Sequence, residues 1–226
     1  MSNKADEKDE LQQVNDALSR SEQFIEKNQK NIIIALAAIV VVVAGILFFR
    51  HSYLAPKEKA AQEMIFIGER YFAVDSFKVA LKGDGAEFIG FEGIIDEYGA
   101  TKTAELASAY AGLCYKNMGD NEKAIEYLKD CDAEDIMVSP ALVGAIGDCY
   151  VELGKAEKAV SYFEKAAKSD NELLSPIYLM KAARVYESLN EYGKALDVYE
   201  TIQKKYPLSQ EGQDIEKYIE RAKTKK

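Results

Sequence analysis

An uninterrupted apolar stretch near the N-terminus limits what this chain can fold into more than any other feature. Residues Ile32 to Phe49 read IIIALAAIVVVVAGILFF, eighteen residues without a charge or a proline. A helix of this length covers about 27 Å at ~1.5 Å per residue, close to the hydrocarbon thickness of a bilayer. Within lipid, a single segment satisfies its backbone groups only as a helix. We therefore predict one transmembrane helix over residues 32–49, in contact with membrane lipid.

A buried core helix and a cleaved signal peptide are the alternatives for this stretch. A core helix usually shows some polar face, which residues 32–49 lack. A signal peptide has a shorter apolar region and small residues before its cleavage site, whereas a cut after Ala55 would place the bulky Tyr53 at the third position before the cut. The pattern favours an uncleaved anchor.

The charge balance excludes some partners and leaves the orientation of the anchor nearly open. Five of the 29 basic and seven of the 38 acidic residues precede Arg50, so the body from Arg50 onward holds 24 basic and 31 acidic residues. An acidic body repels phosphate backbones, and we expect no nucleic-acid partner. Basic residues flank the apolar stretch on both sides almost equally. A short N-terminal tail before a large body favours a cytoplasmic N-terminus with the body outside.

The polar tail of residues 1–31 contains a short helical stripe. Apolar residues recur there at spacings of three, four and seven: Leu11, Val14, Leu18 and Ile25. One interpretation is a marginal helix that lies on the membrane surface or continues the anchor. The other is a cytoplasmic docking or coiled-coil segment.

The body repeats a helical pattern with a period of 35 to 36 residues. Each block has a small residue, a tyrosine three residues later, a turn residue, an alanine, a large apolar residue and a smaller one. In that order the positions are Gly112, Tyr115, Gly119, Ala124, Leu128 and Cys131; then Gly147, Tyr150, Gly154, Ala159, Phe163 and Ala166; then Ala183, Tyr186, Asn190, Ala195, Tyr199 and Ile202. Such a period predicts stacked pairs of antiparallel helices, with the small residues where paired helices approach closely.

Serine–proline pairs predict where two of these helices begin. Ser139-Pro140 and Ser175-Pro176 each offer a capping hydroxyl followed by proline at the first helical position. The two pairs lie 36 residues apart, in step with the repeat.

These blocks resemble the tetratricopeptide repeat, through Gly-x-x-Tyr, the Gly turn, Ala-x-x-x-Phe and the closing Pro207. The resemblance implies an all-α fold: a single N-terminal transmembrane helix followed by a right-handed α-solenoid of tetratricopeptide-like helical hairpins. Upstream, Gly68 and Tyr71 repeat the same three-residue relation, so residues 50–103 are expected to form a linker and a degenerate first repeat. Residues 104–207 form the three clear repeats, and a helical stripe predicts a C-terminal capping helix within 208–226.

No catalytic constellation is evident in the sequence. His51 is the only histidine and stands beside the apolar stretch, without partners for a triad or a metal site. The three cysteines, Cys114, Cys131 and Cys149, fall at positions expected to be buried and small. We therefore expect no enzyme activity, no cofactor and no metal.

A solenoid of helical hairpins exposes a concave groove, which the tetratricopeptide register lets us map onto this sequence. Eleven residues are expected to face it: Glu69, Phe72, Leu113, Lys116, Asn117, Asp148, Val151, Glu152, Met180, Arg184 and Glu187. The register puts Tyr110 and Ala145 where some family members carry amides that grip a C-terminal carboxylate, so that clamp is not expected. A groove for an extended or helical peptide is the hypothesis.

The order of tail, anchor and repeats is also similar to the bacterial ancillary Sec-translocon subunit family, as is the turn from Tyr115 to Asp120. That resemblance implies an inner-membrane protein with a cytoplasmic N-terminus and periplasmic repeats. Its implied partners are Sec translocon subunits, a membrane-anchored periplasmic chaperone or emerging polypeptides. The leading hypothesis is a membrane-tethered scaffold that assists translocation. The alternative is a structural assembly factor for another envelope or secretion complex.

Overall fold

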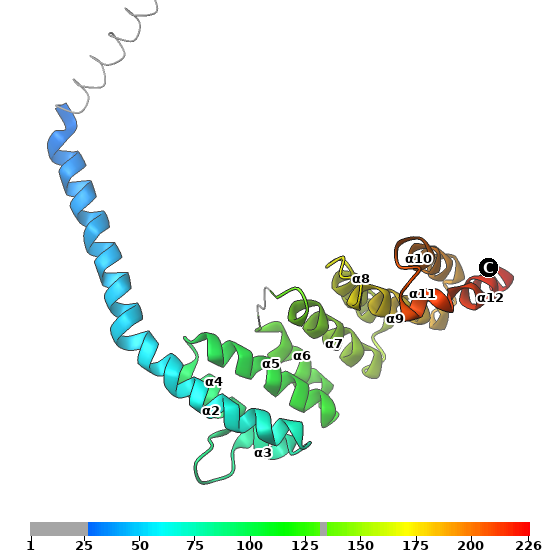
Figure 1. Cartoon of the computed structure of the whole chain (residues 1–226), viewed down its shortest axis with the longest axis horizontal. Helices are drawn as coiled ribbons and strands as arrows, with labels where there is room; N and C mark the ends of the chain where they lie inside the picture. Colours follow the sequence, from blue (N-terminus) through cyan, green and yellow to red (C-terminus); the bar gives the residue numbers. More distant parts are fainter. Residues whose placement is uncertain (1–26, 132–134) are drawn as a thin grey trace, which may run out of the picture. The chain divides into compact units, whose positions relative to one another are not determined.

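The computed structural model describes residues 27–131 and 135–226. The helical stripe predicted between Leu11 and Ile25 lies outside these residues. The chain divides into two compact units, one ending at Pro56 and one from Lys57 to Lys226. Figure 1 traces both along the sequence.

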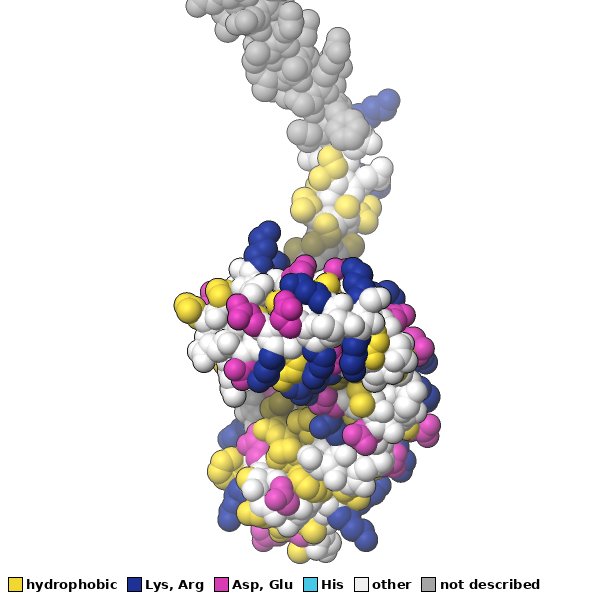
Figure 2. Space-filling view, turned by 90° about the vertical axis from the view of Figure 1, so that its right-hand side faces the viewer, with side chains coloured by type: hydrophobic (Ala, Val, Ile, Leu, Met, Phe, Trp, Pro, Cys, Tyr) yellow, Lys and Arg dark blue, Asp and Glu magenta, His cyan; other side chains and the backbone are white. Residues whose placement is uncertain are grey.

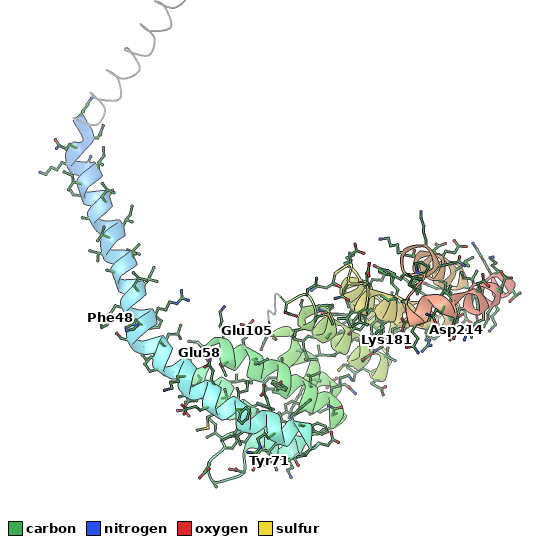
Figure 3. All side chains as sticks on the ribbon, viewed as in Figure 1. Phe48, Glu58, Tyr71, Glu105, Lys181 and Asp214 are labelled. Carbon is green, nitrogen blue, oxygen red and sulfur yellow. The ribbon has the colours of Figure 1, made fainter. Side chains whose placement is uncertain are left out.

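The apolar stretch is helical, as predicted. It lies within the helix Lys27–Ala73, has a mean hydropathy of 3.3, and buries none of its apolar window against the rest of the protein. Figure 3 marks Phe48 near the end of the stretch. By length and composition this segment fits a membrane anchor or a signal sequence. The sequence did not predict the π-helical turn η1 (Arg50–Leu54) that follows. The ring of Phe49, directly before η1, stacks on that of Tyr53 within it, with the centroids 5.1 Å apart.

The second unit is an all-helical solenoid of antiparallel hairpins (Figure 1). Its helices are α2 (Ala55–Ala73), α3 (Phe77–Lys82), α4 (Gly90–Tyr98), α5 (Lys102–Asn117), α6 (Asn121–Lys129), α7 (Val138–Glu152), α8 (Ala156–Ala167), α9 (Leu174–Ser188), α10 (Tyr192–Lys205), α11 (Gln210–Gln213) and α12 (Ile215–Lys225). The regular hairpins are α5 with α6, α7 with α8, and α9 with α10, and they follow the three sequence blocks.

The small residues of the blocks lie where the two helices of a hairpin meet. A methyl group added at Gly112 would lie 2.6 Å from Leu128 Cγ, and one added at Gly147 would lie 2.6 Å from Phe163 Cε1. The turn residues Gly119, Gly154 and Asn190 all have positive φ, which explains the glycines and the asparagine there. The hairpin packing inferred from the blocks is therefore present in the structure.

The first hairpin is irregular. Gly68 of α2 faces Phe91 of α4, in the same relation as Gly112 to Leu128. The partners are 23 residues apart in the first hairpin and 16 apart in the regular ones, so seven extra residues separate them. The short helix α3 and the turn after it accommodate the extra length. Tyr71 donates a hydrogen bond to Asp84 in that turn, at 3.2 Å.

The prediction of helix starts at the serine–proline pairs is wrong by two residues in both cases. Helix α7 begins at Val138 and α9 at Leu174, so each proline is the third helical residue. Proline fits there because the first-turn N–H groups have no intrahelical acceptor. The caps are earlier residues: Asp135 accepts from the amides of Met137 and Val138, and Asn171 accepts from those of Leu173 and Leu174.

The block tyrosines connect each hairpin to the one before it. Tyr115 donates to Glu92, Lys129 donates to the hydroxyl of Tyr150 at 3.3 Å, and Tyr186 donates to Glu164 at 2.7 Å. In all three cases the charged partner directly follows the large apolar residue of the preceding hairpin. The tyrosines therefore form polar contacts between repeats as well as covering the packed surface.

The C-terminal segment closes the end of the solenoid with two helices instead of the single one expected. The short α11 begins after Ser209, whose hydroxyl accepts from the amide of Gly212. In α12 the apolar stripe Ile215, Ile219 and Ala222 is buried against the core that contains Tyr199. This packing keeps the apolar face of α10 out of water.

Candidate functional site

One cavity of about 480 Å³ lies along the first helices of the three regular hairpins. The C-terminal parts of α5, α7 and α9 supply most of its walls. The lining residues are Lys116, Asn117, Gly119, Asn121, Asp148, Val151, Glu152, Phe163, Lys181, Arg184 and Val185. The cavity thus spans three successive repeats.

Six of the eleven residues expected to face the groove line this cavity. They are Lys116, Asn117, Asp148, Val151, Glu152 and Arg184. The repeat register places them together because corresponding residues of α5, α7 and α9 point to the same side of the solenoid. Their role in binding remains a prediction.

The other five predicted residues are not among those that line the cavity. Met180 is only 6% exposed and is packed with Ala183, so its expected place in the groove is wrong. Phe72 and Leu113 are partly buried against the core. Glu187 is held by Arg221 of α12, with 2.5 Å between Oε2 and Nη2. Glu69 is half-buried beside Tyr110, whose pKa is raised by burial and by the nearby Glu69 carboxylate.

Five residues that line the cavity were not predicted: Gly119, Asn121, Phe163, Lys181 and Val185. The repeat register could have predicted Lys181. It stands two residues before Ala183, the small residue of the third block. Tyr110 and Ala145 hold the same position relative to Gly112 and Gly147. Met180 corresponds instead to Ala109 and Gly144, both buried. A consistent register therefore selects Lys181 and rejects Met180.

Asp148 connects the three cavity-lining helices electrostatically. Its Oδ1 lies 2.7 Å from the Nζ of Lys181 on α9, and its Oδ2 lies 3.8 Å from the Nζ of Lys116 on α5. Lys181, labelled in Figure 3, also lies over the rings of Phe163 and Tyr178, at 5.6 and 5.7 Å from their centroids. The Lys181–Asp148 pair is thus fixed in place, whereas Lys116 is held only at long range.

Comparison with protein families agrees with the helical repeats of the fold. Residues 111–135 and 142–173 match one tetratricopeptide-repeat family model, and residues 178–209 match another. The chain contains tetratricopeptide repeats. The matched segments follow the three sequence blocks. None of the curated proteins compared with the chain matches it in sequence.

Solved structures show the same repeat fold. A crystal structure of the MamA protein is similar with a TM-score of 0.52 and 18% identity, covering 73% of this chain and 91% of that one. A second MamA crystal structure gives a TM-score of 0.50 and 19% identity, covering 70% of this chain and 94% of that one. At this level of identity the likeness is one of fold. The presence of tetratricopeptide repeats supports a role for this chain as a protein–protein interaction scaffold.

Proposed function

We propose that this protein is a membrane-tethered, non-catalytic scaffold whose repeats grip segments of other polypeptides in the α5–α7–α9 cavity. The observation that carries the proposal is this cavity, where three repeats present charged, amide and apolar groups along one continuous surface. A polypeptide segment suits such a lining better than a compact small molecule, since the walls come from three successive repeats.

The apolar segment supports the tethered part of the proposal. Its 18-residue window is long and apolar enough to cross a membrane and packs against nothing else in the described residues. A tether raises the local concentration of the repeats near partners in the same membrane, so contacts that are weak in solution become occupied. We place the tail in the cytoplasm and the repeats in the periplasm of a bacterial inner membrane.

A finer proposal concerns the partners. The order of short tail, apolar segment and repeats supports a scaffold at the Sec translocon that holds translocon subunits, a membrane-anchored chaperone or emerging polypeptides. A scaffold for another envelope or secretion complex is the alternative. Purification in mild detergent separates the two, because recovery of translocon subunits favours the first and recovery of an envelope complex alone favours the second.

Cell fractionation tests the tether. We expect the full-length chain expressed in bacteria to sediment with membranes and to resist an alkaline carbonate wash. Protease added to spheroplasts should digest the repeats and leave the cytoplasmic tail and the membrane segment protected. Full-length protein in the supernatant after ultracentrifugation would contradict the tether, and protected repeats would contradict the orientation.

Photocrosslinking in intact cells tests the cavity. A photoreactive residue at position 116 or 184 should capture polypeptides. The same residue at Ser161, which is exposed on α8 and does not line the cavity, is the matched control. Equal capture from position 161 would contradict the proposed site.

A further inference from the structure

The charge inside the cavity differs in sign from that of the body around it. Three cations line it, Lys116, Lys181 and Arg184, against the two carboxylates Asp148 and Glu152. The body from Arg50 onward has seven more acidic than basic residues. A concave surface with an excess of positive charge therefore sits in an acidic protein and attracts segments of negative charge.

Two of the three cations retain hydrogen-bonding capacity for a ligand. Lys181 is committed to Asp148 at 2.7 Å and to two aromatic rings. Lys116 lies 3.8 Å from the second Asp148 oxygen, beyond hydrogen-bond distance. Arg184 is exposed and pairs with no carboxylate among the described residues, and its guanidinium carbon lies 5.9 Å from the centroid of the Tyr218 ring. Lys116 and Arg184 approach the cavity from α5 and α9, on either side of α7.

The cavity also offers apolar surface between these two cations. Val151 of α7 is 43% exposed although it lines a concave surface. Val185 and the ring of Phe163 lie among the other lining residues. Figure 2 shows a similar mixture on the face it presents, with Lys and Arg side chains along one edge of a hollow and hydrophobic side chains on another. An aliphatic side chain placed against Val151 would remove apolar surface from water.

We propose that the cavity selects acidic polypeptide segments that carry an aliphatic residue among their carboxylates. In this arrangement ligand carboxylates accept hydrogen bonds from Lys116 and Arg184, and the aliphatic side chain packs on Val151. A basic segment would find only Glu152 among the cavity carboxylates without a salt bridge to another described residue, and it would be repelled by the three cations. The inference rests on the proposed peptide-binding function and specifies the chemistry of its ligand.

Peptide binding to the full-length protein in detergent micelles or nanodiscs tests the preference. The probes are short fluorescent peptides, capped at both ends, that alternate glutamate and leucine. Matched versions carry glutamine or lysine in place of glutamate, or serine in place of leucine. We expect the glutamate–leucine peptide to bind at least roughly tenfold more tightly than each matched version. Its affinity should fall as salt is added, because the contacts with exposed charges are screened.

Variants assign the preference to the cavity. The double variant Lys116→Glu/Arg184→Glu should bind the acidic peptide at least roughly tenfold more weakly than the wild type and bind the lysine peptide more tightly. Glu152→Lys should bind the acidic peptide more tightly than the wild type does. Lys158→Glu, an exposed charge on α8 outside the cavity, is the matched control and should change little. If the double variant unfolds more readily than the wild type, Arg184→Gln alone replaces it.

The outcomes separate this inference from the proposed function. Equal affinity for the glutamate and glutamine peptides, together with a loss of affinity in the Val151→Ser variant, overturns the acidic preference and leaves the proposed peptide binding intact. Unchanged affinity in Lys116→Glu/Arg184→Glu overturns the assigned site. Binding of none of the peptides, together with equal crosslinking from positions 116 and 161, overturns both the inference and the proposed function.

Discussion

Single small residues determine how closely the helices of each hairpin approach. Gly112 and Gly147 face large side chains of the partner helix, and the corresponding Ala183 in the third repeat is fully buried. The second helices contribute Ala124, Ala159 and Ala195, none of which is exposed to solvent. A larger side chain at any of these positions must push two helices apart.

The variant Gly147→Ala should therefore destabilise the solenoid by about 1–3 kcal/mol, because the new methyl group would overlap the ring of Phe163. Gly193→Ala is the matched control, since a methyl group there meets only the flexible end of Lys226 at 3.6 Å. That substitution should be neutral or stabilise α10 by up to ~1 kcal/mol. Urea denaturation measures both. Equal midpoints for the two variants would contradict the packing assigned to Gly147.

The three cysteines should differ in reactivity. Burial raises the pKa of Cys114 to about 12 and that of Cys149 to about 11, so the nucleophilic thiolate is scarce at neutral pH. Cys131 was expected to be buried but is only half-buried, because α6 ends two residues before it at Lys129.

Brief treatment of the native protein with a maleimide should thus modify Cys131 first, and all three thiols should react after denaturation. Mass spectrometry of peptides locates the label. Native-state labelling of Cys114 or Cys149 as fast as Cys131 would show that the repeats open more readily than the packing implies.

At the scale of the elements, polar contacts fix where helices begin and how hairpins connect. Asp135 and Asn171 occupy corresponding positions before α7 and α9, and each accepts from two backbone amides. Asn171 also extends to the preceding loop, where its amide donates to the carbonyl oxygen of Ile136 at 3.3 Å. Asn171 therefore both caps α9 and links two repeats.

Replacing this cap should be costly. Asn171→Ala is expected to lower the free energy of unfolding by about 1 kcal/mol, because first-turn amides of α9 lose their acceptor. Ser139→Ala in the α7 serine–proline pair should have little effect, since Asp135 already supplies the cap there. Thermal unfolding followed by circular dichroism compares the two. A larger loss of stability in Ser139→Ala than in Asn171→Ala would indicate that the serine is the functional cap.

The contact between the first two hairpins should depend on pH. Burial raises the pKa of Glu92, but hydrogen bonds from Lys82 and Tyr115 outweigh it, so the pKa lies below the ordinary 4.5. A carboxylate with a lowered folded-state pKa stabilises the fold above the unfolded-state value and loses this contribution as pH falls through the folded value.

Glu92→Gln should accordingly cost about 1 kcal/mol at neutral pH, and the difference from the wild type should shrink as the pH falls below about 4.5. Urea denaturation across the pH range measures this difference. A difference between wild type and variant that stays constant down to about pH 3, well below the ordinary glutamate pKa, would contradict the role of the ionised carboxylate.

At the scale of the whole molecule, each hairpin covers the apolar face of its neighbour, and the last regular one is covered by α12. Ending the chain at Asp214 would remove Ile215, Ile219 and Ala222 from this core. We expect a loss on the order of 3–6 kcal/mol from the lost apolar burial, with increased binding of a hydrophobic dye.

Removal of only Lys225 and Lys226 is the control, because both are exposed. It should leave the urea midpoint unchanged. An unchanged midpoint after the longer truncation would show that α12 is dispensable for the solenoid.

The sequence alone was sufficient to predict the apolar segment, the hairpin period, the turn positions and most of the packed residues of each block, Cys131 excepted. These features depend on residues close together in the chain, where helical periodicity and backbone preferences fix which face is buried. The same register located six cavity residues, because corresponding positions of stacked helices point the same way.

Only the tertiary structure decided the rest. The contact of Gly68 with Phe91, the hydrogen bond from Asn171 to Ile136 and the pairing of Glu187 with Arg221 all join residues that meet only through folding. Phe163 lines the cavity although it belongs to the second helix of its hairpin, and Lys181 lies there paired with Asp148. The positions at which side chains from three repeats converge depend on how their helices pack, and local sequence preferences do not specify that geometry.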